Sequence, residues 1–201
     1  MGDLSRKAGD LASADATYRE GLDVYRKLVT RAGDVALWRL YLWLALKEVA
    51  SLKLAMNDTV AARAALSEAV ETGGKVLATN PQNALWLQDL WLQYDQLGTL
   101  EAEGRNTQGA LAAFEGGLAV GRRLIELNPT NNRWEPALAV ALYRIGESRR
   151  KLGNKDGART ALSESLSLVE KLEREGRLTD AQRDWPALVR KSIADLDSPS
   201  R

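Results

Sequence analysis

Side chains capable of acid, base or nucleophilic chemistry are few in this sequence, because its 201 residues include no His and no Cys. Imidazole bases, Ser-His-Asp triads, thiolate nucleophiles and Cys- or His-based zinc sites are therefore excluded. Two carboxylates that lie close in sequence, Glu101 and Glu103, stand two positions apart, so on a helix they point to different sides. We expect no enzymatic activity, no bound metal and no cofactor.

A glycine-rich run and the net charge exclude further classes of function. The segment GGLAVG at 116–121 falls inside an expected helix and lacks the strand and turn that a phosphate-binding loop requires. The 28 Lys and Arg residues balance 27 Asp and Glu residues, so no general attraction to nucleic acid or anionic lipid is expected. The longest strongly apolar stretch, 40–46, is far shorter than the roughly 20 residues that cross a bilayer. We expect a cytoplasmic protein that binds neither nucleic acid nor membrane.

The aromatic residues show the strongest pattern in the sequence, because Trp38, Trp86 and Trp134 are spaced 48 residues apart. The same step connects alanines and, at other positions, sets of large apolar residues. These sets are Ala14, Ala62, Ala110 and Ala158; Leu22, Val70, Leu118 and Leu166; and Tyr18, Leu66, Phe114 and Leu162. No insertion or deletion interrupts the period, so the sequence is built of internal repeats.

Within each repeat the apolar residues follow a helical period. Trp86, Leu90, Tyr94 and Leu97 fall three or four positions apart, which places them on one face of a helix. No stretch alternates as a strand would. The pattern predicts helices at 10–31, 35–56, 59–78, 83–104, 107–127, 131–152, 155–175 and 179–196. The expected N-caps are Asp10, Asp58 or Thr59, Thr107 and Asp156.

Small residues recur where the two helices of a hairpin would cross. Gly2, Ala50, Gly98 and Gly146 share one position of the repeat and permit close approach. A single hairpin cannot bury its apolar face, so the hairpins must stack. We predict an all-α fold, an α-solenoid of stacked antiparallel helical hairpins with a C-terminal capping helix, as one domain. Its expected parts are a partial first unit at 1–33, full units at 34–81, 82–129 and 130–177, and a capping helix with tail at 178–201.

One stretch resembles a known repeat family. Leu97-Gly98, followed by Ala110, Phe114 and Gly117-Leu118, is similar to the tetratricopeptide (TPR) pattern of Leu-Gly in the first helix and Ala, aromatic, small residue and Leu in the second. The 48-residue unit is longer than the usual one of roughly 34, which implies helices extended by about two turns each. Such long units resemble the C-terminal TPR arrays of large bacterial multidomain signalling proteins.

The resemblance implies a non-catalytic scaffold that binds a protein or peptide ligand in a concave groove lined by the first helix of each hairpin. It places groove residues in three successive units. They are Leu44, Lys47 and Ser51; Leu92, Asp95 and Thr99; and Val140, Tyr143, Glu147 and Arg150. These positions do not repeat chemically, as expected either for a surface specialised for one ligand or for solvated positions that are free to vary.

The tryptophans have two interpretations. Trp38, Trp86 and Trp134 are interpreted as core wedges between stacked units. Trp43 and Trp91 each stand one helical turn before a groove residue, at the border between core and groove. Packing in the core and a platform for a partner are both open for these two, and we include both among the candidate partner-binding residues.

The two ends of the sequence suggest an alternative function. Residues 179–196 do not repeat the earlier units and carry a capping box at Thr179 and Gln182, which indicates a solvating cap. At the other end, Gly2 matches Ala50, so the sequence begins part-way through a helix and the apolar face of 10–31 lacks its cover. The alternative is a self-association or structural module at the C-terminus of a larger bacterial signalling or effector protein, with a homodimer formed through the N-terminal end.

Overall fold

The computed structural model describes residues 10–31 and 35–197, and every regular element within these ranges is a helix. Gly2, the start of the expected unit 1–33 and the tail 198–201 lie outside the described residues. The described α-helices are α2 (Leu11–Arg31), α3 (Ala36–Ala55), α4 (Thr59–Thr79), α5 (Ala84–Glu103), α6 (Thr107–Leu127), α7 (Glu135–Lys151), α8 (Lys155–Arg174) and α9 (Trp185–Asp195). The predicted all-α fold is confirmed.

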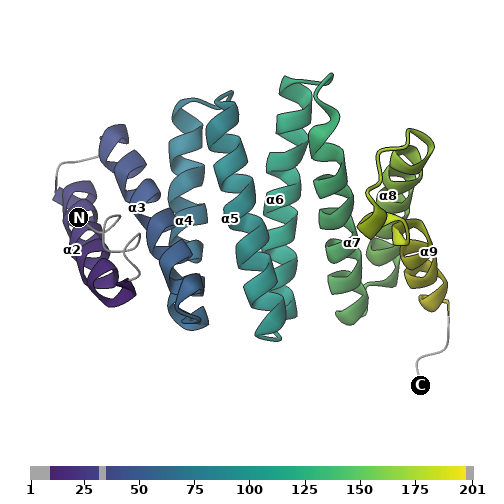
Figure 1. Cartoon of the computed structure of the whole chain (residues 1–201), viewed down its shortest axis with the longest axis horizontal. Coiled ribbons are helices and arrows are strands. Elements are labelled where there is room, and N and C mark those ends of the chain that lie inside the picture. The colour runs from purple at the N-terminus through teal and green to yellow at the C-terminus, as the bar shows by residue number, and fades with distance from the viewer. Residues whose placement is uncertain (1–9, 32–34, 198–201) are drawn as a thin grey trace. The chain divides into compact units, whose positions relative to one another are not determined.

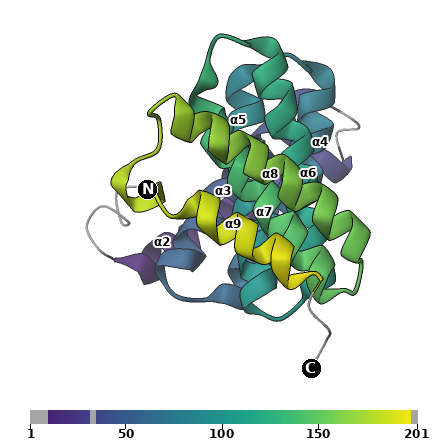
Figure 2. The same cartoon turned by 90° about the vertical axis from the view of Figure 1, so that its right-hand side faces the viewer.

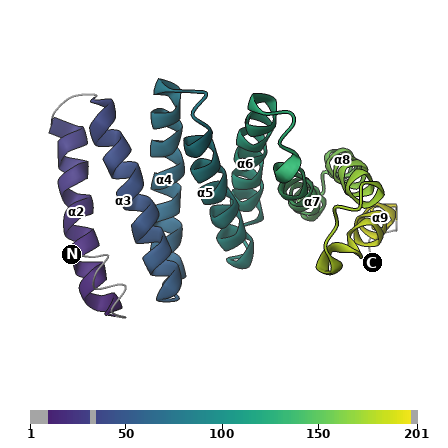
Figure 3. The same ribbon diagram turned by 45° about the horizontal axis from the view of Figure 1, so that its top comes forward.

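The chain forms two compact parts, each longer than one 48-residue repeat. From here on we call them unit 1 (residues 1–100) and unit 2 (residues 101–201). Unit 1 contains α2, α3, α4 and most of α5, and these helices follow one another side by side (Figure 1, Figure 3). Unit 2 contains the end of α5 and α6 to α9, and within it α7 packs on both α6 and α8. Short turns reverse the chain between successive helices, so each unit is made of antiparallel hairpins.

The turns inside the hairpins repeat with the 48-residue period. Asn57, Arg105 and Gly153 adopt the left-handed backbone conformation, with φ of 57°, 59° and 78°. The residue after each of them donates its backbone N–H to the carbonyl five positions earlier, at 2.9, 2.8 and 2.9 Å. These bonds satisfy carbonyl groups that a helix end leaves without an intrahelical partner. Three turns therefore end the first helix of a hairpin in the same way.

The N-caps follow the same period and correct two predictions. The side chains of Asp58, Asn106 and Asn154 accept hydrogen bonds from the backbone N–H three residues later, at 3.1, 3.0 and 2.9 Å. The predicted caps Thr107 and Asp156 are wrong, because each already lies inside its helix. Asn carries the acceptor that an N-cap needs, and it stands at the position that repeats Asp58.

The C-terminal segment differs from the single helix expected over 179–196. Thr179 and Gln182 form the predicted capping box, but the box closes a short 3₁₀ turn, Asp180–Gln182. The α-helix α9 begins only at Trp185, with Pro186 in its first turn, where a missing backbone N–H costs nothing.

The position of α9 shows that this segment continues the repeat, contrary to the expectation. α9 packs on α8 (Figure 2). Pro186 on α9 and its C-cap residue Leu196 are both buried. They stand three periods of 48 residues after Leu42 and Leu52, which are buried on α3. α9 therefore occupies the place of a first helix in a following hairpin.

The α7–α8 hairpin is closed by a contact between Gly146 and Leu162. A Cβ atom on Gly146 would lie 2.6 Å from Cγ of Leu162 and 3.3 Å from the carbonyl oxygen of Ala158. Leu162 and Ala158 are fully buried, so neither has space to move aside. The small residue predicted from the repeat at this position serves the close helix crossing.

We expect Gly146→Ala to lower the free energy of unfolding by about 1–3 kcal/mol, because the added methyl group overlaps Leu162. Gly74→Ala is the control, since Gly74 lies inside α4 with open space around it. Alanine there should raise the free energy of unfolding by up to about 1 kcal/mol through its helix propensity. Urea denaturation followed by circular dichroism measures both, and a Gly146→Ala protein as stable as the parent would contradict the close crossing.

Asn154→Ala should lower the free energy of unfolding by about 0.5–2 kcal/mol, because it removes the acceptor for the backbone N–H of Gly157. Asp156→Ala removes only a charge near the start of α8 and should cost less, about 0.3–1 kcal/mol. The same urea titration compares the two. A larger loss at Asp156 than at Asn154 would show that the cap is misassigned.

Candidate functional site

The indole ring of Trp43 joins three helices of unit 1. Trp43 lies on α3 and is 1% exposed. Its Nε1 donates a 2.6 Å hydrogen bond to Oε1 of Gln93 on α5. The ring edge rests on Gly73 of α4, where a Cβ atom would lie only 2.5 Å from Nε1. Trp43 is therefore a core residue, and its burial favours packing in the core over a platform for a partner, the two interpretations that the sequence leaves open.

The amide nitrogen of Gln93, Nε2, points away from Trp43, because the amide oxygen Oε1 accepts the hydrogen bond from the indole. Because indole Nε1 can only donate, it fixes the amide with Oε1 toward Trp43 and Nε2 away from it. Gln93 is 2% exposed, and its Nε2 has no hydrogen-bond partner among the described residues. A buried donor without an acceptor costs about 1–3 kcal/mol.

A polar hollow of about 240 Å³ lies between α3 and α5 in unit 1, and we call it the polar hollow. Lys47 Nζ lies 3.0 and 3.1 Å from the two carboxylate oxygens of Asp89 across it. Its other lining residues are Glu48, Ser51, Leu92, Gln93 and Gln96. The structure thus brings together three of the predicted groove residues, Lys47, Ser51 and Leu92.

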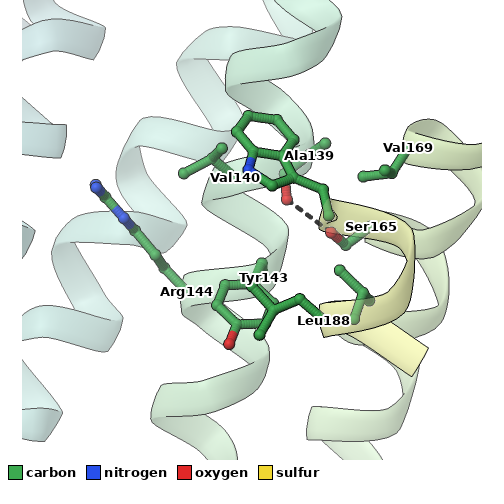
Figure 4. Close-up of a pocket in the computed structure, with 9 residues that line it drawn as sticks. Ala139, Val140, Tyr143, Arg144, Ser165, Val169 and Leu188 are labelled. Carbon is green, nitrogen blue, oxygen red and sulfur yellow. Dashed lines mark hydrogen bonds between the residues drawn. The ribbon is translucent and has the colours of Figure 1, made fainter. Parts of the chain in front are cut away.

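An apolar cavity of about 250 Å³ lies between α7, α8 and α9 in unit 2, and we call it the apolar cavity. Its floor is closed by residues that are at most 2% exposed, Ala139, Val169 and Val189, whereas Leu188 is 47% exposed. Figure 4 shows the Arg144 side chain pointing away from the other labelled residues. The full lining is Ala139, Val140, Tyr143, Arg144, Ser165, Val169, Trp185, Leu188 and Val189, which includes the predicted groove residues Val140 and Tyr143.

The polar hollow and the apolar cavity occupy the same place in the repeat. Five lining positions of the cavity stand two periods of 48 residues after lining positions of the hollow. They pair Lys47 with Tyr143, Glu48 with Arg144, Asp89 with Trp185, Leu92 with Leu188, and Gln93 with Val189. The ion pair of unit 1 is replaced by two aromatic residues in unit 2, and an acidic residue is replaced by a basic one.

The floors of the two sites differ because one large side chain is missing from unit 2. Two periods after Trp43 stands Ala139, and two periods after Gly73 stands Val169. Since valine is much smaller than an indole, it fills only part of the lost volume, and the remaining volume forms the apolar cavity above this floor. Ser165 at this floor donates its hydroxyl to the carbonyl of Ala139 at 2.8 Å, so its hydrogen is already used.

Other predicted groove residues lie outside these two sites. Glu147 and Arg150 pair with each other on α7, with 2.7 Å between carboxylate and guanidinium, and the hydrogen bond to Glu147 raises the pKa of Arg150 above its ordinary value. Thr99 donates its hydroxyl to the carbonyl of Asp95 at 2.9 Å within α5. Trp91 is half-buried and does not line the polar hollow.

Leu44 lines a third hollow, of about 270 Å³, between α2 and α3 in unit 1. Tyr18, Tyr25 and Tyr41 also line it, and we call it the tyrosine hollow. The rings of Tyr25 and Tyr41 stack with their centroids 5.8 Å apart. Leu44 and Tyr41 are exposed, whereas Leu22 on the same α2 is buried, so the apolar face of α2 is only partly open.

The tryptophans that repeat every 48 residues are half-buried, not the core wedges that the sequence predicts. The guanidinium of Arg133 lies over the ring of Trp134, 4.7 Å from its centroid. The rings of Trp38 and Tyr41 have their centroids 6.2 Å apart. The indoles at this repeated position therefore lie at the edge of the core.

Sequence reasoning missed the residues that distinguish the two sites. Ala139, Val189 and Gln93 are not among the predicted groove residues, and neither are Trp185 and Leu188 at the mouth of the apolar cavity. A signal was present, because stepping by 48 from Trp43 leads through Trp91 to Ala139 and so marks a loss of volume. This loss of side-chain volume indicates a cavity only when the burial of Trp43 is known from the structure.

The described residues contain neither a cluster of metal-binding side chains nor a helix that could cross a membrane. Within 10–31 and 35–197, no group of three or more Asp, Glu, His or Cys side chains converges as a metal site would. None of the described helices is long and apolar enough to cross a membrane. The two sites offer hydrogen-bonding groups in unit 1 and apolar surface in unit 2.

Comparison with known proteins agrees with this architecture. Residues 140–168, which belong to α7, α8 and the turn between them, match the tetratricopeptide repeat family model. Among solved structures, the nearly identical TPR-like repeats of a kinesin light chain-like protein from Podosopora anserina are 12% identical, over 97% of this chain and 90% of that one, with a TM-score of 0.52. A single-residue variant of the same protein has the same identity and coverage, with a TM-score of 0.53.

A third solved structure, that of MamA, is less similar in its fold. MamA is 18% identical over 98% of this chain and 87% of its own, with a TM-score of 0.44. No curated protein matches the chain. The fold assignment rests on the family match and on the Podosopora anserina structures, whose low identity speaks for the fold alone. The chain therefore contains a tetratricopeptide repeat and has the helical repeat fold of TPR-like proteins.

Proposed function

We propose that this protein is an interaction module that binds a peptide or helical segment of a partner protein against the first helices of its hairpins. Each unit has its own candidate contact surface, formed by α3 with α5 in unit 1 and by α7 with α9 in unit 2. TPR repeat proteins generally mediate protein-protein interaction, which agrees with this proposal.

The observation that carries the proposal is the apolar cavity. Leu188 is exposed at its mouth, Tyr143 and Trp185 are half-buried, and the floor is apolar. Binding energy at interfaces is concentrated where a side chain enters a well-packed, dry pocket of this kind. A surface that keeps an open apolar pocket beside two aromatic residues is therefore suited to receive a partner.

The polar hollow supports the same function in unit 1 with different chemistry. It combines the ammonium group of Lys47, the hydroxyl group of Ser51 and the amide groups of Gln93 and Gln96. Such groups can hydrogen-bond the main chain of a bound segment. The donors of Gln93 Nε2, which lack a partner among the described residues, favour an acceptor at this place.

We expect that peptides selected from a displayed random library on the immobilised protein lose at least about tenfold in affinity when Tyr143→Ala and Leu188→Ala are combined. Both changes remove apolar surface at the mouth of the cavity. Leu85→Ala is the matched control, because Leu85 is exposed on α5 and lines none of the three sites. Isothermal titration measures the affinities, and circular dichroism verifies the helical content. Selected peptides that bind the double variant as tightly as the parent would contradict the proposal.

Self-association is a second candidate function, favoured by the tyrosine hollow. Its exposed residues Tyr41 and Leu44 would bury apolar surface against a second copy. We expect the parent protein to form dimers at high concentration and Tyr41→Glu to remain monomeric, because a carboxylate would lose its hydration in the interface. Light scattering after size exclusion measures both masses. A parent that stays monomeric at high concentration would reject this candidate.

A further inference from the structure

Unit 1 of the same protein shows which kind of side chain occupies the place of the apolar cavity. In unit 1 the indole of Trp43 fills the position that Ala139 leaves empty in unit 2, two periods of 48 residues later. The surrounding positions correspond as well, since Gly73, Leu92 and Gln93 become Val169, Leu188 and Val189. An aromatic ring is therefore the shape for which this part of the repeat is built.

We propose that the apolar cavity receives one aromatic side chain of a partner segment. The inference rests on the proposed function and specifies the chemistry of the partner. The occupant enters from the mouth, between Tyr143 on α7 and Leu188 on α9, and its ring lies over Ala139.

The volume and the lining favour a single ring. At about 250 Å³ the cavity is smaller than the roughly 300–1,000 Å³ of sites for drug-sized molecules. Val169 stands where Gly73 makes room for the indole edge, so a phenyl ring fits better than an indole in the same pose. The hydroxyl of Ser165 is held by the carbonyl of Ala139, and the floor needs no polar partner.

The charged residue of the lining does not bring its charge into this space. The Arg144 side chain points away from the other labelled residues in Figure 4. Its guanidinium lies over the ring of Phe114, 5.3 Å from the centroid. The space that the ring of the partner would occupy is therefore apolar.

Three small probes that share a phenyl ring and differ in their charged or neutral head group test whether the ring enters the cavity. They are 3-phenylpropanoate, neutral 3-phenylpropanol and cationic 3-phenylpropylamine, titrated into the full chain. Two-dimensional NMR follows the methyl group of Ala139 and the indole N–H of Trp185. We expect all three probes to shift these signals, because the phenyl ring that they share enters the cavity. No shift of these signals with any probe would overturn the inference.

Substitutions locate the binding. Ala139→Phe places a ring in the cavity from within, and should abolish probe binding while the thermal unfolding midpoint is unchanged or higher. Ala187→Phe is the matched control, because Ala187 stands one period after Ala139, is exposed on α9 and does not line the cavity. It should bind all three probes as the parent does.

A further variant covers the case in which Ala139→Phe does not fold. Leu188→Asn changes only the exposed mouth and should weaken all three probes; unchanged probe affinities in this variant would contradict the assignment. The experiment also separates the two proposals. Probe binding at the cavity without selection of any peptide would reject the proposed function and keep the aromatic site. Selected peptides that lack aromatic residues and are insensitive to Ala139→Phe would reject the site and keep the function.

Discussion

Three hairpin turns with one backbone geometry hold the register on which the rest of the structure depends. In each, a left-handed residue is followed by a residue that caps the next helix and also donates its N–H five positions back. The three N to O distances of these hydrogen bonds lie between 2.8 and 2.9 Å. Because the turns are equal, residues separated by 48 positions meet equivalent surroundings within their own units. Differences between units 1 and 2 at such positions therefore follow from the identity of the side chains.

This register allows the protein to change a site without changing its scaffold. The scaffold positions keep their size, as the alanines at 14, 62, 110 and 158 do, and all four are buried. The groove positions exchange an ion pair for two aromatic residues, and Glu48 for Arg144. Each exchange alters what a partner meets, while the buried alanines of the scaffold stay the same. Repeat folds separate stability from recognition in this way.

The fold could be predicted from the sequence, because helical period and repeat length are local and regular properties. The local pattern predicts Thr107 and Asp156 as N-caps, whereas the step of 48 residues from Asp58 leads to the observed caps Asn106 and Asn154. The burial of Trp43 depends on Gly73 and Gln93, which lie on two other helices, and a one-dimensional pattern does not show which side chains meet. The apolar cavity was missed for the same reason, because an alanine in a helix is ordinary until the volume around it is known.

Trp43 can be regarded as a ligand that is covalently attached to its own binding site. A tethered group competes with free molecules at an effective concentration that is typically millimolar or higher, and here the helix holds the ring already in place. The indole also satisfies its donor on Gln93, so displacement would leave two polar groups unpaired. In unit 1 the ring of Trp43 therefore blocks this position, and any partner must bind outside the ring. The same backbone in unit 2, lacking the tether, leaves the position vacant for a ring supplied by another chain.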